Sequence, residues 1–179
     1  MLVRSAVLTD ASKIERLISA EVTGSSLIPR SLPEICENIR DFLVIEDKGK
    51  VVGCGALHLY GLHLAEIRSI TIRKTVRGKG AGRLLVDALL AEAERHRVTC
   101  ICLFTKIPEF FSRLGFRIAE RESLPDKAYR DCQFCPKLHA CDEIAMVRGE
   151  LPNFAILAPS EKVNAPGFAE LRPGLRILH

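Results

Sequence analysis

The chain of 179 residues contains no tryptophan, and aromatic residues make up only 6% of it. It therefore offers few rings on which nucleic-acid bases could stack, and its net charge of +4 is too small to indicate nucleic-acid binding by itself. No apolar run is long enough to cross a membrane, and the N-terminus lacks the apolar core and cleavage site of a signal peptide. We therefore expect a cytoplasmic protein that binds neither nucleic acid nor membranes and whose mild positive charge suits anionic small molecules.

Hydrophobic residues make up 47% of the chain, which is enough for one domain with a substantial core. In a cytoplasmic protein the seven cysteines are expected to be reduced thiols or metal ligands, not disulfides.

The hydrophobic periodicity predicts an α/β protein, with strands and helices mixed in one domain and a mixed α+β sheet. Strands are expected over 2–8, 65–72, 99–104 and 143–148, and a hairpin over 42–60 around Lys48-Gly49. Helices are expected over 9–22 with Thr9 or Asp10 as N-cap, over 31–40 with a capping box of Ser31 and Glu34, over 80–98, and from Pro108 to Gly115. The domain should span 1–150. Periodicity is weak over 151–179, which we expect to be an appended tail or a partner-docking arm.

A glycine-rich loop, "RGKGAG", lies between a predicted strand and a predicted helix. It is not a P-loop, because Gly82 is followed by Arg83 and Leu84 and not by Lys and Ser or Thr. The glycines at 78, 80 and 82 also lack the spacing of a dinucleotide fingerprint. Consecutive backbone amides at a helix N-terminus bind anions, so the loop predicts a phosphate site. The alternative is a tight turn with solvated basic residues.

The Arg-x-x-Gly-x-Gly pattern in this setting resembles the acetyl-CoA loop of the GNAT N-acetyltransferases, and "FFSRLGF" is similar to that family's "FYxKxGF" segment beside the CoA thiol. The resemblance implies the GNAT fold, acetyl-CoA as cosubstrate, and no metal or redox cofactor. It places the pantetheine arm on the backbone of Ile70, Thr71 and Ile72. It places the pyrophosphate on the loop residues Arg77, Gly78, Lys79, Gly80, Ala81, Gly82 and Arg83.

Four blocks look like the short, single-domain N-acetylglutamate synthases of bacteria: "LIPRSLPEICENIRDFLV", "VVGCGALHLYGLHLAEIRSITI", "FTKIPEFFSRLGF" and "LPDKAYRDCQFCPKLHACDEIAM". This similarity covers residues 1–150. It implies acetyl transfer from acetyl-CoA to the α-amino group of glutamate, the first step of arginine synthesis. Members of that family are often homodimers.

The resemblance also assigns roles in the reaction. Glu66 stands where the family's base lies; the alternatives are an exposed strand carboxylate or an ion pair with Arg68. Backbone amides near Ser69 and Ile70 are the expected oxyanion donors. The family's usual acid is a Tyr, but Phe110 and Phe111 have no proton to donate. Thr105 is then the candidate acid, with its neighbour Lys106 as a second.

A substrate with two carboxylates requires cationic partners, preferably Arg. Arg30, Arg68 and Lys127 match, with Lys106 as a further candidate contact, although such residues would not easily separate glutamate from glutamine or aspartate. Two rival functions remain: acetylation of another amine, and non-catalytic binding of acetyl-CoA by a regulator, which the missing Tyr keeps open.

A cluster at the end of the predicted domain, Cys132, Cys135, His139 and Cys141, contains a Cys-x2-Cys pair typical of half a zinc site. A structural zinc is one prediction. Free thiols that stabilise a loop and a redox switch are the alternatives.

Overall fold

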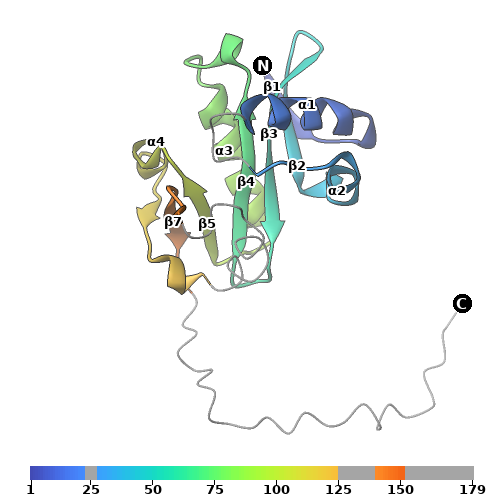
Figure 1. Cartoon of the computed structure of the whole chain (residues 1–179). Coiled ribbons are helices and arrows are strands. Elements are labelled where there is room, and N and C mark those ends of the chain that lie inside the picture. Colours follow the sequence, from blue (N-terminus) through green and yellow to red (C-terminus); the bar gives the residue numbers. More distant parts are fainter. Residues whose placement is uncertain (23–27, 125–139, 152–179) are drawn as a thin grey trace, which may run out of the picture.

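The computed structural model describes residues 1–22, 28–124 and 140–151, which form a seven-stranded sheet with helices on both faces (Figure 1). The strands are β1 (Leu2–Ser5), β2 (Phe42–Asp47), β3 (Lys50–Leu59), β4 (Ala65–Ile72), β5 (Cys100–Thr105), β6 (Arg117–Ile118) and β7 (Ile144–Gly149). The α-helices are α1 (Ala11–Val22), α2 (Leu32–Glu37), α3 (Ala81–Arg95) and α4 (Pro108–Ser112). This confirms the predicted mixed α/β class. In these ranges no helix has the length and apolarity to cross a membrane.

The strand order is β1-β2-β3-β4-β5-β7-β6, and all neighbours are antiparallel except β4 and β5. These two are parallel because α3 carries the chain back across the sheet between them. Over the described residues their ladder consists of two pairs, Ala65 with Ile101 and Glu66 with Cys102. The two strands therefore separate after Glu66, and β5 continues toward α4 (Figure 1).

The core on one face of the sheet lies under α3. Leu85 and Leu89 of this helix are fully buried and belong to one apolar cluster with Leu57, Ile67 and Leu103 from the central strands. Because successive strand residues point to opposite faces, Glu66 points away from α3, to the other face.

That other face holds two smaller apolar clusters. In one, Ile14 and Ile18 of α1 and Ile35 of α2 pack with Val44 and Ala56. The second cluster contains Cys100 and Cys102 of β5, which are both fully buried, as the apolar run at 99–104 predicted. Glu66 lies on β4 between the strands of these two clusters.

Two predicted local features are confirmed, the hairpin turn and the Ser31 cap of α2. Lys48 and Gly49 have φ of 49° and 74°, as a two-residue hairpin turn requires. The Ser31 hydroxyl accepts a hydrogen bond from the Glu34 amide (3.4 Å) at the start of α2.

Two local predictions are wrong, and one strand was not predicted. Thr9 and Asp10 do not cap α1: they lie inside a 3-10 turn (Leu8–Asp10) that runs directly into the helix, and Val7 stands at the N-cap position of this turn. Helix α4 ends at Ser112 and not near Gly115. Strand β6 was not expected, because two residues are too few to show alternation.

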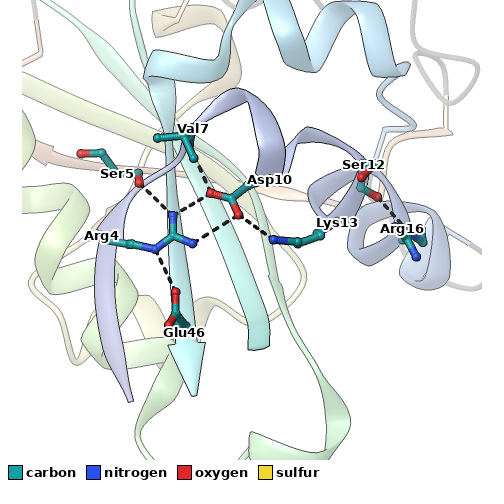
Figure 2. Close-up of polar contacts among 8 residues, drawn as sticks. All are labelled: Arg4, Ser5, Val7, Asp10, Ser12, Lys13, Arg16 and Glu46. Atoms are coloured by element: carbon teal, nitrogen blue, oxygen red, sulfur yellow. Dashed lines mark hydrogen bonds and ion pairs between the residues drawn. The ribbon is translucent and has the colours of Figure 1, made fainter. Parts of the chain in front are cut away.

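Asp10 is instead the centre of a polar network that joins β1, α1 and β2 (Figure 2). Its side chain is 1% exposed and accepts hydrogen bonds from Arg4 (Nη1 to Oδ2, 2.6 Å), the Val7 amide (3.2 Å) and Lys13 (3.2 Å). Arg4 also binds Glu46 through Nε (3.0 Å). The hydrogen bond from Arg4, helped by those from the Val7 amide and Lys13, holds the pKa of Asp10 well below its usual range.

We expect Asp10→Asn to lower the free energy of unfolding by about 2 kcal/mol at neutral pH, since it removes the charged acceptor of a buried ion pair. The carboxylate stabilises the fold fully above its unfolded pKa of about 3.9, and this contribution is lost as the pH falls toward the depressed folded value. Urea unfolding should therefore show a smaller effect of the substitution near pH 3 than near pH 7.

Asp87→Asn is the matched control: this carboxylate is 50% exposed beside Arg83, and its loss should cost less than about 0.5 kcal/mol at either pH. Equal costs for the two substitutions at neutral pH would contradict the prediction.

Candidate active site

Glu66 is a buried carboxylate at the point where β4 and β5 separate. Its side chain is 2% exposed, its register partner on β5 is Cys102, and its partner on β3 is His58. The Tyr60 hydroxyl donates a hydrogen bond of 2.9 Å to Glu66 Oε2. The alternative of an exposed strand carboxylate is therefore wrong, and Arg68 lies two residues further along the same face of β4.

A second polar pair lies beside this carboxylate. His58 Nδ1 and Asp41 Oδ2 are 2.9 Å apart, and the His58 ring meets the Tyr60 ring edge to face, with 5.1 Å between centroids. The sequence analysis missed Asp41, His58 and Tyr60. Their only signal is the β3–β4 register, which places His58 opposite Glu66 and cannot be read from one sequence.

A β-bulge interrupts β4 directly after this polar group. Cys54 pairs with Thr71 and Ala56 with Arg68, so Ser69 and Ile70 together face the single residue between them on β3. Ser69 has φ of 55° and is 8% exposed. A bulge takes backbone groups out of the ladder, so the structure gives Ser69 and Ile70 the irregular backbone that an oxyanion site needs.

Buried thiols border the bulge and the carboxylate. Burial raises the pKa of the Cys54 thiol to about 12, and it also raises the pKa of Cys100. The Cys54 sulfur lies 3.9 Å from the Ser69 carbonyl oxygen. These cysteines are therefore protonated, unreactive parts of the core near neutral pH.

The glycine loop runs from the end of β4 into α3. Gly78 and Gly80 have φ of 75° and 81°, and a Cβ at either position would meet no described atom within 4 Å. Gly80 is the N-cap of α3, and its carbonyl accepts the Leu84 amide (3.0 Å). Helix α3 begins at Ala81, so Gly82 and Arg83 lie in its first turn. The open space beside the two left-handed glycines, at the N-terminus of a fifteen-residue helix, suits a bound anion.

The exposed Arg77 side chain ties this loop to two neighbouring elements. Its Nε donates to the Ile72 carbonyl (2.8 Å), and its Nη2 forms an ion pair with Glu21 of α1 (2.7 Å). Of the other basic residues near the loop, Arg73, Lys74 and Lys79 are exposed, and Arg83 pairs with Asp87 (3.4 Å). The Arg77 amide is also engaged, because it donates to the Lys74 carbonyl (3.3 Å), so the amides from Gly78 to Gly82 are the candidates for a phosphate.

Thr105 ends β5 and is 7% exposed. Its hydroxyl oxygen accepts the Ile107 amide (3.0 Å), so the hydroxyl proton takes no part in that bond. Lys106 forms an ion pair with Asp142 (2.5 Å). Because β4 and β5 are parallel, Thr105 lies at the same end of the sheet as the bulge and the glycine loop.

The aromatic block after β5 packs between the core and α3. Phe111 is 5% exposed, and its ring contacts those of Phe110 and Phe116 edge to face at 4.9 and 5.8 Å. A Cβ on Gly82 would lie 3.5 Å from the Phe110 ring. The pair that stands in place of the family's Tyr is therefore apolar and joins α4 to the start of α3.

Arg30 and Cys141 are the remaining predicted residues that the structure describes. Arg30 forms an ion pair with Glu34. Cys141 is half buried, and its sulfur accepts a hydrogen bond from Arg121 (3.0 Å). Lys127, Cys132, Cys135 and His139, like nearly all of 151–179, lie outside the described residues. Within the described ranges no group of three or more His, Cys, Asp or Glu side chains could hold a metal ion, and a zinc at the cysteine cluster stays a prediction.

Relatives share this architecture. The GNAT acetyltransferase domain model matches residues 38–118. An uncharacterized N-acetyltransferase of Chlorobaculum tepidum is 44% identical over 82% of this chain and 94% of its own length. An amino-acid acetyltransferase of Mycobacterium tuberculosis is 36% identical over 64% of this chain and 67% of its own.

Solved structures agree on the fold. A Mycobacterium tuberculosis protein in complex with CoA superposes with a TM-score of 0.73 at 29% identity, over 84% of this chain and all of the other. The Neisseria gonorrhoeae N-acetylglutamate synthase, complexed with coenzyme A and N-acetyl-glutamate, gives 0.74 at 23% identity over 85% of this chain and 35% of its own. With the bulged β4, the β4–β5 separation and the glycine loop in place, these matches show that the chain belongs to the GNAT family of N-acetyltransferases.

Proposed function

We propose that this acetyltransferase moves the acetyl group of acetyl-CoA to the α-amino group of glutamate. The observation that carries the proposal is the buried Glu66 at the separation of β4 and β5, with Arg68 two residues away on the same face of β4. A carboxylate there can accept a proton from an amine, and a guanidinium there can bind a carboxylate of the same substrate.

In this proposal acetyl-CoA lies along β4 beyond Glu66. The backbone of Ile70, Thr71 and Ile72 is not paired with β5 in the described structure, so it can pair with the pantetheine arm as a further strand would. The amides from Gly78 to Gly82 then bind the pyrophosphate, with the help of the α3 dipole and the exposed Lys79. The thioester would lie near the bulge, between the ends of β4 and β5.

The chemistry combines proton transfers with formation of an N–C bond and cleavage of the C–S bond. Glu66, directly or through a water molecule, takes a proton from the substrate ammonium, and the freed lone pair of nitrogen forms a bond to the thioester carbon. Amides at Ser69 and Ile70 would stabilise the oxyanion. The C–S bond then breaks, and the departing thiolate takes a proton from the Thr105 hydroxyl, with Lys106 as the alternative donor. The nitrogen gives up its second proton, which restores that donor, and Glu66 later releases its own proton to solvent.

The choice of glutamate rests on charge and on relatives. Arg68 and Arg30 oppose cationic substrates, and Arg68 is the primary partner for a carboxylate because it lies on the same face of β4 as Glu66. Several curated relatives are named amino-acid acetyltransferase, among them the Mycobacterium tuberculosis protein. Lys127 would be a second carboxylate partner. The product would enter arginine synthesis in the cytoplasm, and a homodimer is the expected assembly.

We expect purified protein to release CoA from acetyl-CoA with glutamate and not with lysine or a polyamine. Thiol release measured against a panel of free amino acids, with glutamine and aspartate included, tests this directly. Turnover with glutamine and not with glutamate would support the proposed acetyl transfer but would identify glutamine as the substrate. Tight CoA binding without turnover of any amine would instead favour a non-catalytic regulator.

We expect Glu66→Gln to lower kcat by about a hundredfold, since it removes the base that accepts the amine proton. Acetyl-CoA affinity, measured by calorimetry, should change little, because the proposed CoA contacts are made by backbone groups further along β4. Glu46→Gln is the matched control, because Glu46 also lies on a strand and pairs with Arg4 away from the site. Equal activity of the Glu66→Gln variant and the wild type near neutral pH would remove Glu66 from this role.

We expect Gly80→Ala to weaken CoA binding by about tenfold. A Cβ at this left-handed residue costs about 1–2 kcal/mol in backbone strain, and it fills the space beside the proposed phosphate. Gly49→Ala provides the control, because Gly49 has a similar φ of 74° and open space around it in a hairpin far along the chain from the loop. Both substitutions should lower stability similarly, while only Gly80→Ala should change the CoA dissociation constant in calorimetry. Equal CoA affinities for the two variants would contradict the assignment of the loop.

A further inference from the structure

We propose that Tyr60 is a positioning residue for Glu66: its hydroxyl fixes the carboxylate in the orientation from which it accepts the substrate's proton. This inference rests on the proposed function, and it extends the site to a residue of the β3–β4 connection that the sequence did not indicate. The contact that carries it is the hydrogen bond from Tyr60 Oη to Glu66 Oε2, 2.9 Å long, to a carboxylate that is 2% exposed.

The Tyr60 ring is itself held on two sides. It packs against the apolar cluster that includes Leu64, Leu124 and Cys102, and its edge-to-face contact with His58 holds it from β3. His58 in turn is bound to Asp41. In addition, the Tyr60 amide donates to the Leu64 carbonyl (3.0 Å), which fixes the backbone of the same turn. A phenol with so little freedom can transmit its position to the group it binds.

A hydrogen bond from a phenol to a carboxylate is charge-assisted and directional. It restricts rotation of the carboxylate about the final side-chain torsion angle. Holding a catalytic group in a fixed orientation accounts for a large share of the rate enhancement that comes from proximity. Among the described residues, the titratable and charged groups that the strand register places next to Glu66 are His58 from β3, Arg68 from β4 and Cys102 from β5, with Asp41 bound to His58. Tyr60 donates a direct hydrogen bond to Glu66.

A double-mutant cycle separates positioning from a general structural role. We expect Tyr60→Phe, which keeps the ring, to lower kcat by about tenfold and to leave the calorimetric affinity for acetyl-CoA unchanged. In a Glu66→Gln background the same substitution should have no further effect on kcat, because the group it positions is already lost. A tenfold loss in both backgrounds would overturn the proposal, since Tyr60 would then act independently of Glu66, for example as an acid itself.

The composition of the chain offers a second readout that needs no turnover. The protein has no tryptophan and two tyrosines, Tyr60 and Tyr129. In a Tyr129→Phe background the near-ultraviolet absorbance of tyrosinate therefore reports Tyr60 alone. We expect Tyr60 to stay protonated to a higher pH in this background than after addition of Glu66→Gln, because the neighbouring carboxylate disfavours the phenolate. Circular dichroism identifies the pH range in which both variants are folded, and the titrations are compared within that range.

Glu46→Gln in the same background is the control, and it should leave the Tyr60 titration where it was. Identical titrations with and without Glu66 would overturn the proposed contact. This outcome is separate from a failure of the proposed function, because a protein that acetylates no amine would still show the shifted titration if Tyr60 binds Glu66.

Discussion

The site depends on one constraint, which is the early end of the β4–β5 ladder. A parallel pair normally continues for the length of its strands, but here the described ladder ends after Glu66 and Cys102. The bulge at Ser69 also interrupts the regular geometry of β4 close to this point. A sheet that stays closed elsewhere thus opens at its centre, where a chain-like ligand can bind backbone groups without unfolding any strand.

The polarity of the site follows from the same arrangement. The face of the sheet away from α3 carries two separate apolar clusters, one under α1 and α2 and one on β5 and β7. Glu66 on β4, His58 on β3 and Tyr60 directly after β3 lie at the division between them. A buried carboxylate would be costly alone, and the hydroxyl of Tyr60 lowers that cost by satisfying one of its oxygens. The neighbouring thiols of Cys54 and Cys100 add no charge, since burial keeps them protonated.

Most of the fold could be predicted from hydrophobic periodicity. Strand β4 begins and ends as expected at Ala65 and Ile72, and the Lys48-Gly49 turn is where the glycine placed it. The N-cap of α1 could not be predicted, because Asp10 lies inside a 3-10 turn and its carboxylate binds Arg4 of β1, a contact that hydrophobic periodicity does not reveal. For the site, the glycine loop was visible as a pattern, whereas Tyr60 and His58 matter only through the cross-strand register. The bulge had one indirect signal, a glycine within β3 at position 55, since glycine in a strand often marks such an irregularity.

The ion pair of Arg77 with Glu21 has a consequence for binding energetics. Together with the bond to the Ile72 carbonyl, it ties the loop before α3 to both α1 and the end of β4. A loop rich in glycine is costly to order, and a flexible one would impose that entropy cost on each ligand it received. Here the side chain of Arg77 helps to order the loop when the protein folds, so a phosphate bound there, as we propose, would not have to order the loop itself.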